Sequence, residues 1–153
     1  MRGNWTPQEQ EDPFKRAMQQ FVSDYSGKAA DLKVSMEKSM PKSMDLRGAG
    51  KPDWFFDEFV YGTELPHYSL TNDFSIADGE TMVHLKLAQS NVSEKFVMRV
   101  PVYLQLQNGQ TRRLFVVVLH GNGTLDQVIK LGKLPSPAKA MMVNYNADVL
   151  SDN

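Results

Sequence analysis

The chain has 153 residues, of which 41% are hydrophobic and 23% are charged, and this composition is typical of a globular protein with one domain or two small ones. Its formal net charge of −1 argues against the clustered basic surface that nucleic acid binding requires. The absence of cysteine excludes a disulfide framework, a thiolate zinc site and a cysteine nucleophile.

The N-terminal stretch MRGNWTPQEQEDPF lacks the apolar run of a signal peptide, and no segment approaches the roughly 20 apolar residues of a membrane-spanning helix. We therefore expect a soluble chain without membrane insertion, and the sequence leaves its compartment unknown. Residues 1–5 are expected to be a disordered end or a cloning remnant.

Residues 6–63 are expected to form a helical segment of about three helices. Thr6 and Glu9 form a capping box, with Pro7 at the first helical position, and apolar side chains then follow at helical spacing as far as Tyr25. This pattern predicts a first helix over residues 7–26.

Proline and glycine residues set the limits of the next two helices. The second helix is expected to end at about Met40, because Pro41 disfavours helical backbone before it. After a Gly- and Ser-rich surface loop, Pro52 is expected to begin a short third helix that ends at Gly62.

The third helix carries the aromatic run WFFDEFVYGT, residues 54–63, in a chain with 10% aromatic residues overall. Rings placed around so short a helix imply burial on more than one side. We therefore predict that the run packs between the helical segment and the domain that follows. The predicted inter-domain packing residues are Trp54, Phe55, Phe56, Phe59 and Tyr61.

After Gly62 the apolar residues change from the helical period of about 3.6 to the strand period of about 2. Residues 96–107 form a long strand with one apolar face, and Asn108-Gly109 predicts a hairpin to a partner strand over 110–121. Pro101 cannot donate to a strand ladder, so it is expected to mark an edge or a bulge. Further strands are expected over 68–76, 81–89, 124–131 and 138–145.

This order of elements predicts an α+β protein: a cluster of about three helices, then an antiparallel immunoglobulin-like β-sandwich of six or seven strands over residues 64–150. Helices come first and strands afterwards, without alternation, so a parallel α/β sheet is not expected.

The residues offer little catalytic chemistry. His67, His84 and His120 lie in separate strand-like segments, and no His-Glu-x-x-His motif is present. The glycines of HGNGTL, residues 120–125, indicate a hairpin turn rather than a phosphate cradle. No catalytic, cofactor-binding or metal residue is therefore assigned.

Asp53, Asp57 and Glu58 are the acidic residues of the aromatic helix, and Asp53 and Asp57 share one helix face. The favoured interpretation is that acidic side chains near a helix N-terminus complement its macrodipole. The alternative is a small hydrolase in which Asp57 or Glu58 acts with one of the histidines.

Taken in order, four segments resemble the C-terminal part of aminopeptidase N-like zinc aminopeptidases of the gluzincin family. They are DYSGK, WFFDEFVYGTELPHY, FVMRVPVYLQLQNG and PSPAKAMMVNYNADVL, and the likeness covers about residues 12–150. In that family the thermolysin-like catalytic domain ends with a pattern close to Phe-Phe-x-x-Trp-x-x-Gly-x-Gly-x-Pro. An immunoglobulin-like sandwich follows it directly.

The match can be followed residue by residue near that pattern. Phe55 and Phe56 match the paired phenylalanines, and Phe59 stands where the family usually has tryptophan. Gly62 and Pro66 match the exit turn, whereas Glu64 replaces a frequent glycine. The residues that resemble the last sandwich strand and the tail of the family are Pro137, Lys139, Asn144, Asp148, Val149 and Leu150.

The family's zinc-binding helix and its Gly-x-Met-Glu-Asn exopeptidase loop would lie upstream of residue 1. The resemblance therefore implies a non-catalytic C-terminal fragment that is not itself an enzyme, binds no cofactor and supports an absent catalytic domain. It implies a zinc-dependent aminopeptidase as the full-length parent, whose compartment the sequence leaves open among secreted, periplasmic and membrane-anchored. The expected partners are that catalytic domain and a second copy bound through exposed helical surface.

A different interpretation is a stand-alone β-sandwich module that recognises a protein or carbohydrate partner. Sandwich folds host many functions, so the fold class does not choose between the two.

Overall fold

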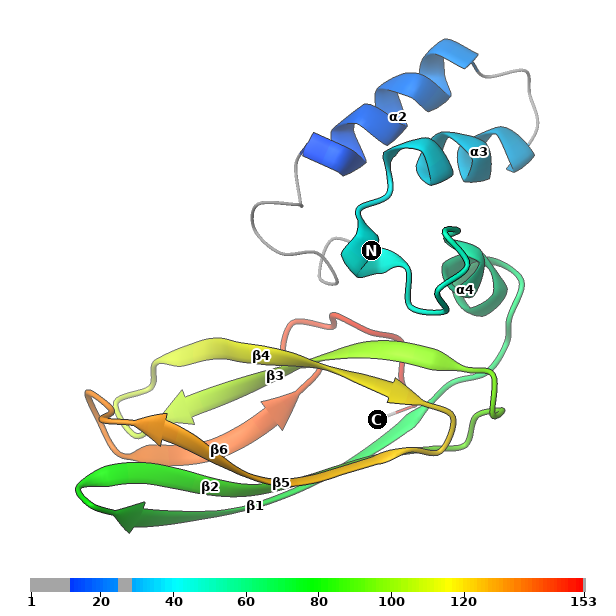
Figure 1. Ribbon diagram of the computed structural model, residues 1–153. Helices are drawn as coiled ribbons and strands as arrows, with labels where there is room; N and C mark the ends of the chain where they lie inside the picture. Colours follow the sequence, from blue (N-terminus) through cyan, green and yellow to red (C-terminus); the bar gives the residue numbers. More distant parts are fainter. Residues whose placement is uncertain (1–11, 25–28, 153) are drawn as a thin grey trace. The chain divides into compact units, whose positions relative to one another are not determined.

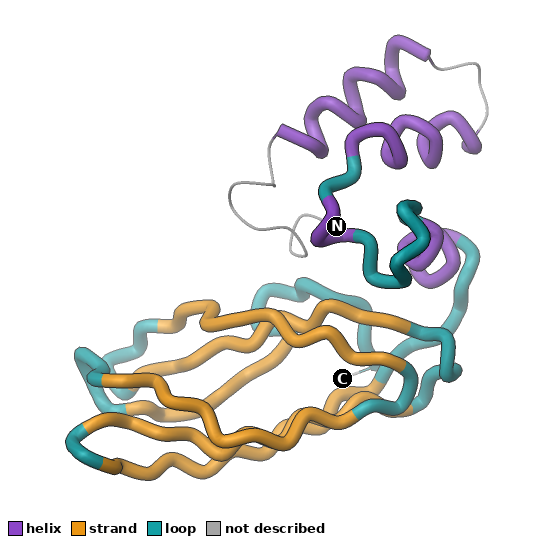
Figure 2. The backbone as a smooth tube through the Cα atoms, in the orientation of Figure 1, coloured by secondary structure: helices purple, strands orange, loops and turns teal. Residues whose placement is uncertain are grey.

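The computed structural model describes residues 12–24 and 29–152, and the chain divides into two compact units, residues 1–63 and 64–153. The first unit is helical and the second consists of two antiparallel sheets, so the chain has the mixed α+β composition that the residue pattern predicts. Figure 1 and Figure 2 show these two kinds of structure. No helix in the described ranges is long and apolar enough to cross a membrane.

The helical unit contains α2 (Asp12–Asp24), α3 (Ala29–Ser39), α4 (Asp53–Phe55) and two short helical turns, η2 (Lys42–Met44) and the π-helical η3 (Phe56–Val60). The predicted capping box at Thr6 and the predicted helix end at Gly27 lie outside the described residues. Pro52 is the residue before α4 rather than its first helical residue.

The loop between α3 and α4 is organised by one carboxylate. Asp45 accepts hydrogen bonds from the backbone N–H groups of Ala49, at 2.9 Å, and Gly50, at 2.8 Å. An aspartate that binds the backbone a few residues ahead stabilises a turn. The glycine-rich stretch is therefore an ordered turn on the surface of this unit.

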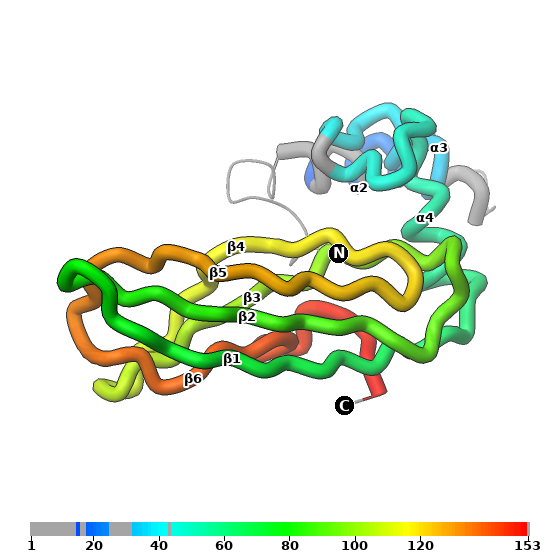
Figure 3. Tube along the Cα trace, turned by 60° about the horizontal axis from the view of Figure 1, so that its bottom comes forward, coloured from blue at the N-terminus to red at the C-terminus, as the bar shows by residue number. Residues whose placement is uncertain are grey.

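The described residues of the second unit, 64–152, form six strands, all antiparallel to their neighbours. They are β1 (His67–Ala77), β2 (Glu80–Ser90), β3 (Val97–Leu106), β4 (Thr111–His120), β5 (Thr124–Gly132) and β6 (Ala138–Val143). One sheet has the order β1-β2-β5 and the other β4-β3-β6. Figure 3 shows β1 beside β6 at one side of the unit, and β4 beside β5 at the other.

The core of this unit lies between the two sheets. Val83, Leu85 and Leu87 alternate along β2 and are fully buried, as expected for a strand with one apolar face. β3 differs from the prediction, because nine of its ten residues are buried and both of its faces are covered.

The C-terminal segment covers part of the second face of β3. The Tyr103 hydroxyl donates to Asp148 Oδ2 at 2.7 Å and accepts from Asn146 Nδ2 at 3.1 Å, and the Tyr103 ring centroid is 5.6 Å from that of Tyr145. Burial raises the pKa of the Tyr103 hydroxyl, with a further contribution from its hydrogen bond to Asp148. The alternation of apolar residues along β3 could not predict that its second face is buried. The residues that bury it belong to an irregular segment, in which Asp148 is 45 residues from Tyr103.

Pro101 lies in the central strand of its sheet, yet its position satisfies the rule that led us to expect an edge or a bulge. It is opposite Val116 of β4, but the pairing of β3 with β6 begins only at Val102. A register shift in the β3–β4 ladder follows between Val102 and Tyr103. Pro101 is therefore at a local edge next to a bulge, where a missing N–H is tolerated.

Two of the predicted turns are hairpins and the third is not. Asp78 and Gly79 both have positive φ, 52° and 74°, which suits a two-residue hairpin between β1 and β2. Gly109, with φ of 85°, closes the β3–β4 hairpin. The prediction of a hairpin at Gly121-Asn122-Gly123 is wrong, because β4 and β5 belong to different sheets and these residues carry the chain between them.

Hydrogen bonds and close packing explain the composition of that connection. Gly121 has φ of 51°, and a Cβ there would lie 3.1 Å from Glu94 Cα, so a larger residue would strain the backbone. Asn122 Nδ2 donates to the Val92 carbonyl at 3.0 Å, and Asn122 Oδ1 accepts from the Val92 N–H at 3.2 Å. The glycines therefore allow the tight connection that carries the chain from β4 in one sheet to β5 in the other.

Candidate functional site

The aromatic run forms α4 and η3, and two of its rings make the core of the helical unit. Trp54 is fully buried, and its Nε1 donates to the Met44 carbonyl at 2.7 Å. Phe56 is also buried and packs against Met36, with Leu32 and Phe55 beside them. These contacts give the run a structural role within its own unit.

The other rings of the run are less buried. Phe55 and Phe59 are one turn apart and stack with their ring centroids 5.1 Å apart. Tyr61 is 66% exposed, with its ring centroid 6.3 Å from that of Phe56. Packing of the five rings against the second unit remains a prediction.

The three carboxylates near these rings all have cationic partners. Arg47 reaches Asp57 Oδ2 with Nη1 at 2.6 Å and Glu58 Oε1 with Nη2 at 3.2 Å. Lys33 pairs with Asp53. Asp53 and Asp57 therefore each contact a positive side chain, which is the arrangement of a structural ion-pair network.

The pair of Lys33 and Asp53 shifts both groups toward their charged forms. The hydrogen bond from Lys33 holds the pKa of the Asp53 carboxyl below its usual value, and the same bond raises the pKa of Lys33. Lys33 Nζ also lies 5.8 Å from the Phe56 ring centroid. A carboxyl with a lowered pKa stays ionised near neutral pH and is a weaker base, so Asp53 is better suited to stabilise the helix than to transfer protons.

The structure does not bring the histidines together. In the β1–β2 ladder His67 is opposite Ser90 and His84 is opposite Asp73, which places them at separate points of one sheet, and His120 ends β4 in the other sheet. His67 Nδ1 lies 2.9 Å from Asp152 Oδ1, and His84 Nε2 lies 2.7 Å from Asp126 Oδ1. Within residues 12–24 and 29–152, no group of three or more His, Asp or Glu side chains is placed to hold a metal ion.

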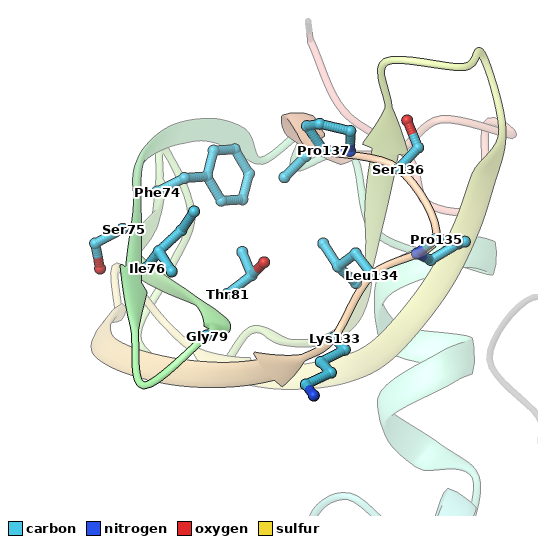
Figure 4. Close-up of a pocket in the computed structure, with 11 residues that line it drawn as sticks. Phe74, Ser75, Ile76, Gly79, Thr81, Lys133, Leu134, Pro135, Ser136 and Pro137 are labelled. Atoms are coloured by element: carbon cyan, nitrogen blue, oxygen red, sulfur yellow. The ribbon is translucent and has the colours of Figure 1, made fainter.

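The strongest candidate for a binding site is a pocket of about 780 Å³ at one end of the second unit. Figure 4 shows Phe74 and Ile76 of β1 directed toward the same space as Leu134 and Pro137 of the β5–β6 loop. Thr81, Ser136 and Lys133 add polar groups to its lining.

This pocket lies where strand β1 and the β5–β6 loop meet. Tyr68 and Ile76 lie at alternate inward positions of β1, yet Tyr68 is 3% exposed and Ile76 is 79% exposed. Ile76 is near the end of β1, beside the Asp78-Gly79 turn, where it lines the pocket together with residues of the β5–β6 loop. The sequence pattern does not predict the pocket, although Ile76 beside the Asp78-Gly79 turn is a signal, since it places an apolar residue at a strand end.

No protein-family model matches the chain, and no curated protein matches it. A function for the chain therefore depends on its own residues and their geometry.

Proposed function

We propose that the chain is the C-terminal part of a zinc aminopeptidase of the gluzincin type, in which it has no catalytic role and supports the catalytic domain. The observation that carries the proposal is the ordered succession of the aromatic run, its exit turn and a β-rich unit. No residue of this chain is a candidate zinc ligand of that family. The zinc chemistry would belong to residues upstream.

The strand order supports the immunoglobulin-like part of the proposal. In that fold strands A, B and E share a sheet, and strand C of the other sheet lies between F and, in variable-type domains, C′. The orders β1-β2-β5 and β4-β3-β6 match A-B-E and C′-C-F, and strands D and G have no counterpart in residues 64–152.

Local geometry also agrees with the residues of the family-like exit turn. A Cβ at Gly62 would lie 2.5 Å from the Asp57 carbonyl oxygen, so glycine is required there. Glu64, which departs from the family pattern, accepts bonds from Ser93 N and Ser93 Oγ, both at 3.0 Å. This interaction explains why glutamate is favourable at a position where the family often has glycine.

The test is to extend the reading frame upstream and to compare the longer protein with the present chain. We expect a His-Glu-x-x-His motif upstream, stoichiometric zinc and hydrolysis of aminoacyl substrates in the longer protein only. Stoichiometric zinc with peptidase activity in residues 1–153 alone would contradict the proposal. So would a reading frame that begins at Met1.

The pocket at Phe74 and Leu134 favours a second candidate, a binding module for a protein or carbohydrate partner. Pockets of roughly 300–1,000 Å³ with mainly apolar walls and a few polar groups are typical of ligand sites. NMR titration with a panel of oligosaccharides and apolar peptides would test it. Shifts centred on Phe74, Ile76 and Leu134 that disappear in Leu134→Ala would support a module, and a panel without such shifts would exclude these ligands.

A further inference from the structure

The strand β5 (Thr124–Gly132) has one edge that no strand in the described part of the chain pairs with. It pairs with β2 alone, at the border of the β1-β2-β5 sheet. Its middle residue, Val128, is 65% exposed. Asp126 and Lys130 stand two residues to either side of Val128, on the same face of the strand. A free edge offers main-chain hydrogen-bonding groups to another strand.

A groove of about 380 Å³ runs between this strand and β4. Phe115 and Val117 of β4 line it together with Leu125 and Ile129 of β5. These core-facing side chains are only half-buried. The interior of the second unit is therefore incompletely covered on this side.

The sequence of β4 also indicates that another chain packs on this side of the second unit. Residues 114–119, LFVVVL, carry no charge, although β4 borders its sheet. Such continuous apolar runs are typical of strands covered on both sides, and exposed apolar edges promote association.

We propose that a second copy of this chain covers this side, with the β5 strands of the two copies paired antiparallel about a two-fold axis through Val128. In this register Val128 meets Val128 of the second copy, and Asp126 lies opposite Lys130 in both directions. A two-fold interface uses the same patch twice, so the patch must be complementary to itself. The charge order of β5 meets this condition.

Other registers also keep the apolar face inward, but they do not pair Asp126 with Lys130. An axis at Asp126 would place two aspartates opposite each other, and an axis at Lys130 would place two lysines opposite each other. Directly opposed like charges destabilise a strand pair, whereas opposite charges stabilise it. The proposed register is thus the one that pairs both charges.

Both charged side chains have room for a second partner. Asp126 contacts His84 at 2.7 Å and Lys86 at 3.6 Å, and its side chain is 48% exposed. Lys130 pairs with Glu80, and its side chain is 62% exposed. Each of them can keep its present contact and reach across a dimer interface.

The added strand would also close the groove. Leu125 lines the groove on the inward face of β5, so Leu125 of the second copy would lie on the side where Phe115 and Val117 are half-buried. This surface is distinct from the helical one, and the proposal does not depend on the zinc aminopeptidase assignment.

Disulfide trapping tests the register directly. The chain has no cysteine, so Val128→Cys introduces a single thiol that would face its own copy across the axis. Opposed residues of antiparallel strands have Cα atoms about 4.5–5.5 Å apart, which suits a disulfide. Ile76→Cys is the matched control, because Ile76 is a β-branched residue on another border strand and is 79% exposed.

We expect Val128→Cys to form a covalent dimer under mild oxidation at least about tenfold faster than Ile76→Cys, because pairing raises the local thiol concentration. Equal rates for the two variants would overturn the proposal. Thermal unfolding of both variants shows that each is folded before oxidation.

Charge exchange supplies an independent test by sedimentation of the full chain over a concentration series. Asp126→Lys or Lys130→Glu alone places like charges opposite each other twice, and each is expected to weaken dimerisation roughly tenfold. The double variant D126K/K130E restores opposite pairs across the axis, although it opposes Glu80 and Lys86 within its own copy. Recovery of the dimer in the double variant is therefore the expected result.

Three outcomes would overturn the proposal. The first is a wild-type chain that stays monomeric at roughly 100 μM, well above the concentrations at which a specific dimer forms. The second is a dimer that neither single variant weakens, which would point to the helical surface instead. The third is a double variant that remains as weak as the single variants.

Discussion

Gln89 links three parts of the second unit through a side chain that is 1% exposed. Its Oε1 accepts from the Tyr68 hydroxyl at 3.0 Å, and its Nε2 donates to the Gly121 carbonyl at 2.6 Å. A buried polar group is tolerated only when its hydrogen bonds are made. The amide of Gln89 therefore fixes the connection between the sheets relative to β1 and β2.

We predict that Gln89→Ala lowers the free energy of unfolding by about 2–4 kcal/mol, because the buried Tyr68 hydroxyl and the Gly121 carbonyl lose their hydrogen bonds to Gln89. Urea unfolding followed by circular dichroism measures the loss. Gln107→Ala is the control, since the Gln107 side chain is exposed. A change below about 0.5 kcal/mol for Gln89→Ala, comparable to a surface substitution, would show that Gln89 is not structurally important.

Asp53 and Lys33 make the stability of the helical unit depend on pH. Because the pKa of Asp53 is lower in the folded state, its contribution is present above the unfolded pKa of about 3.9 and is lost as the pH falls through the folded value. Because the pKa of Lys33 is raised, its contribution is present below about 10.4 and is lost as the pH rises through the folded value.

We therefore predict that Asp53→Asn flattens the fall in melting temperature between about pH 5 and pH 3, as expected for removal of a carboxyl with a lowered pKa. Tryptophan fluorescence is a suitable signal, since Trp54 belongs to the same unit. Lys33→Gln should flatten the acid side in the same way, because it removes the partner that lowers the pKa of Asp53. An unchanged acid slope in both variants would contradict the assignment.

The turn that ends η3 (Phe56–Val60) depends on a glycine. The Tyr61 N–H donates to the Phe56 carbonyl at 2.9 Å, which closes the wide π-helical turn, and the backbone at Asp57 then comes close to Gly62. We predict that Gly62→Ala destabilises the helical unit by about 1–3 kcal/mol, because its Cβ must displace backbone atoms.

Chemical denaturation followed by tryptophan fluorescence checks this prediction. Thr63→Ala is a suitable control, because Thr63 is exposed and adjacent in sequence. Equal stability of Gly62→Ala and the wild type would mean that the turn opens without cost.

At the scale of secondary-structure elements, the sequence predicts the strands and hairpins well. It predicts poorly which other segments pack against them. Alternation placed the strands to within two residues of β1 through β6, and Asp78-Gly79 and Asn108-Gly109 correctly indicated hairpins. The connection at Gly121 was mistaken for a hairpin, because local composition does not tell which sheet the next strand joins.

The same limit applies to the candidate pocket. Ile76 carries the pattern of a core residue but is exposed, since it lines an open pocket together with the distant β5–β6 loop. The ion pairs of Asp53 and Asp57 were also beyond prediction, because Lys33 and Arg47 are ten or more residues away in the chain. Spacing within one helix indicated a shared face but not the partners on it.

At the scale of the whole molecule, we predict that the stabilities of the two units are coupled through the aromatic run. The aromatic run was predicted to pack between them, and the buried rings of Trp54 and Phe56 already have partners in their own unit. Both tryptophans, Trp5 and Trp54, belong to residues 1–63, whereas all six strands belong to residues 64–153. Fluorescence therefore reports on one unit and the strand signal in circular dichroism on the other.

If the aromatic run couples the two units, a destabilising substitution in one unit must also destabilise the other unit. We predict that Gln89→Ala, in the second unit, lowers the melting temperature seen by tryptophan fluorescence by about 4 °C or more, together with the transition seen by circular dichroism. Adding Phe59→Ala should separate the two transitions, because Phe59 is a half-buried ring of the run. If Gln89→Ala leaves the melting temperature seen by tryptophan fluorescence unchanged, the two units unfold independently. The prediction that the aromatic run packs between them would then be wrong.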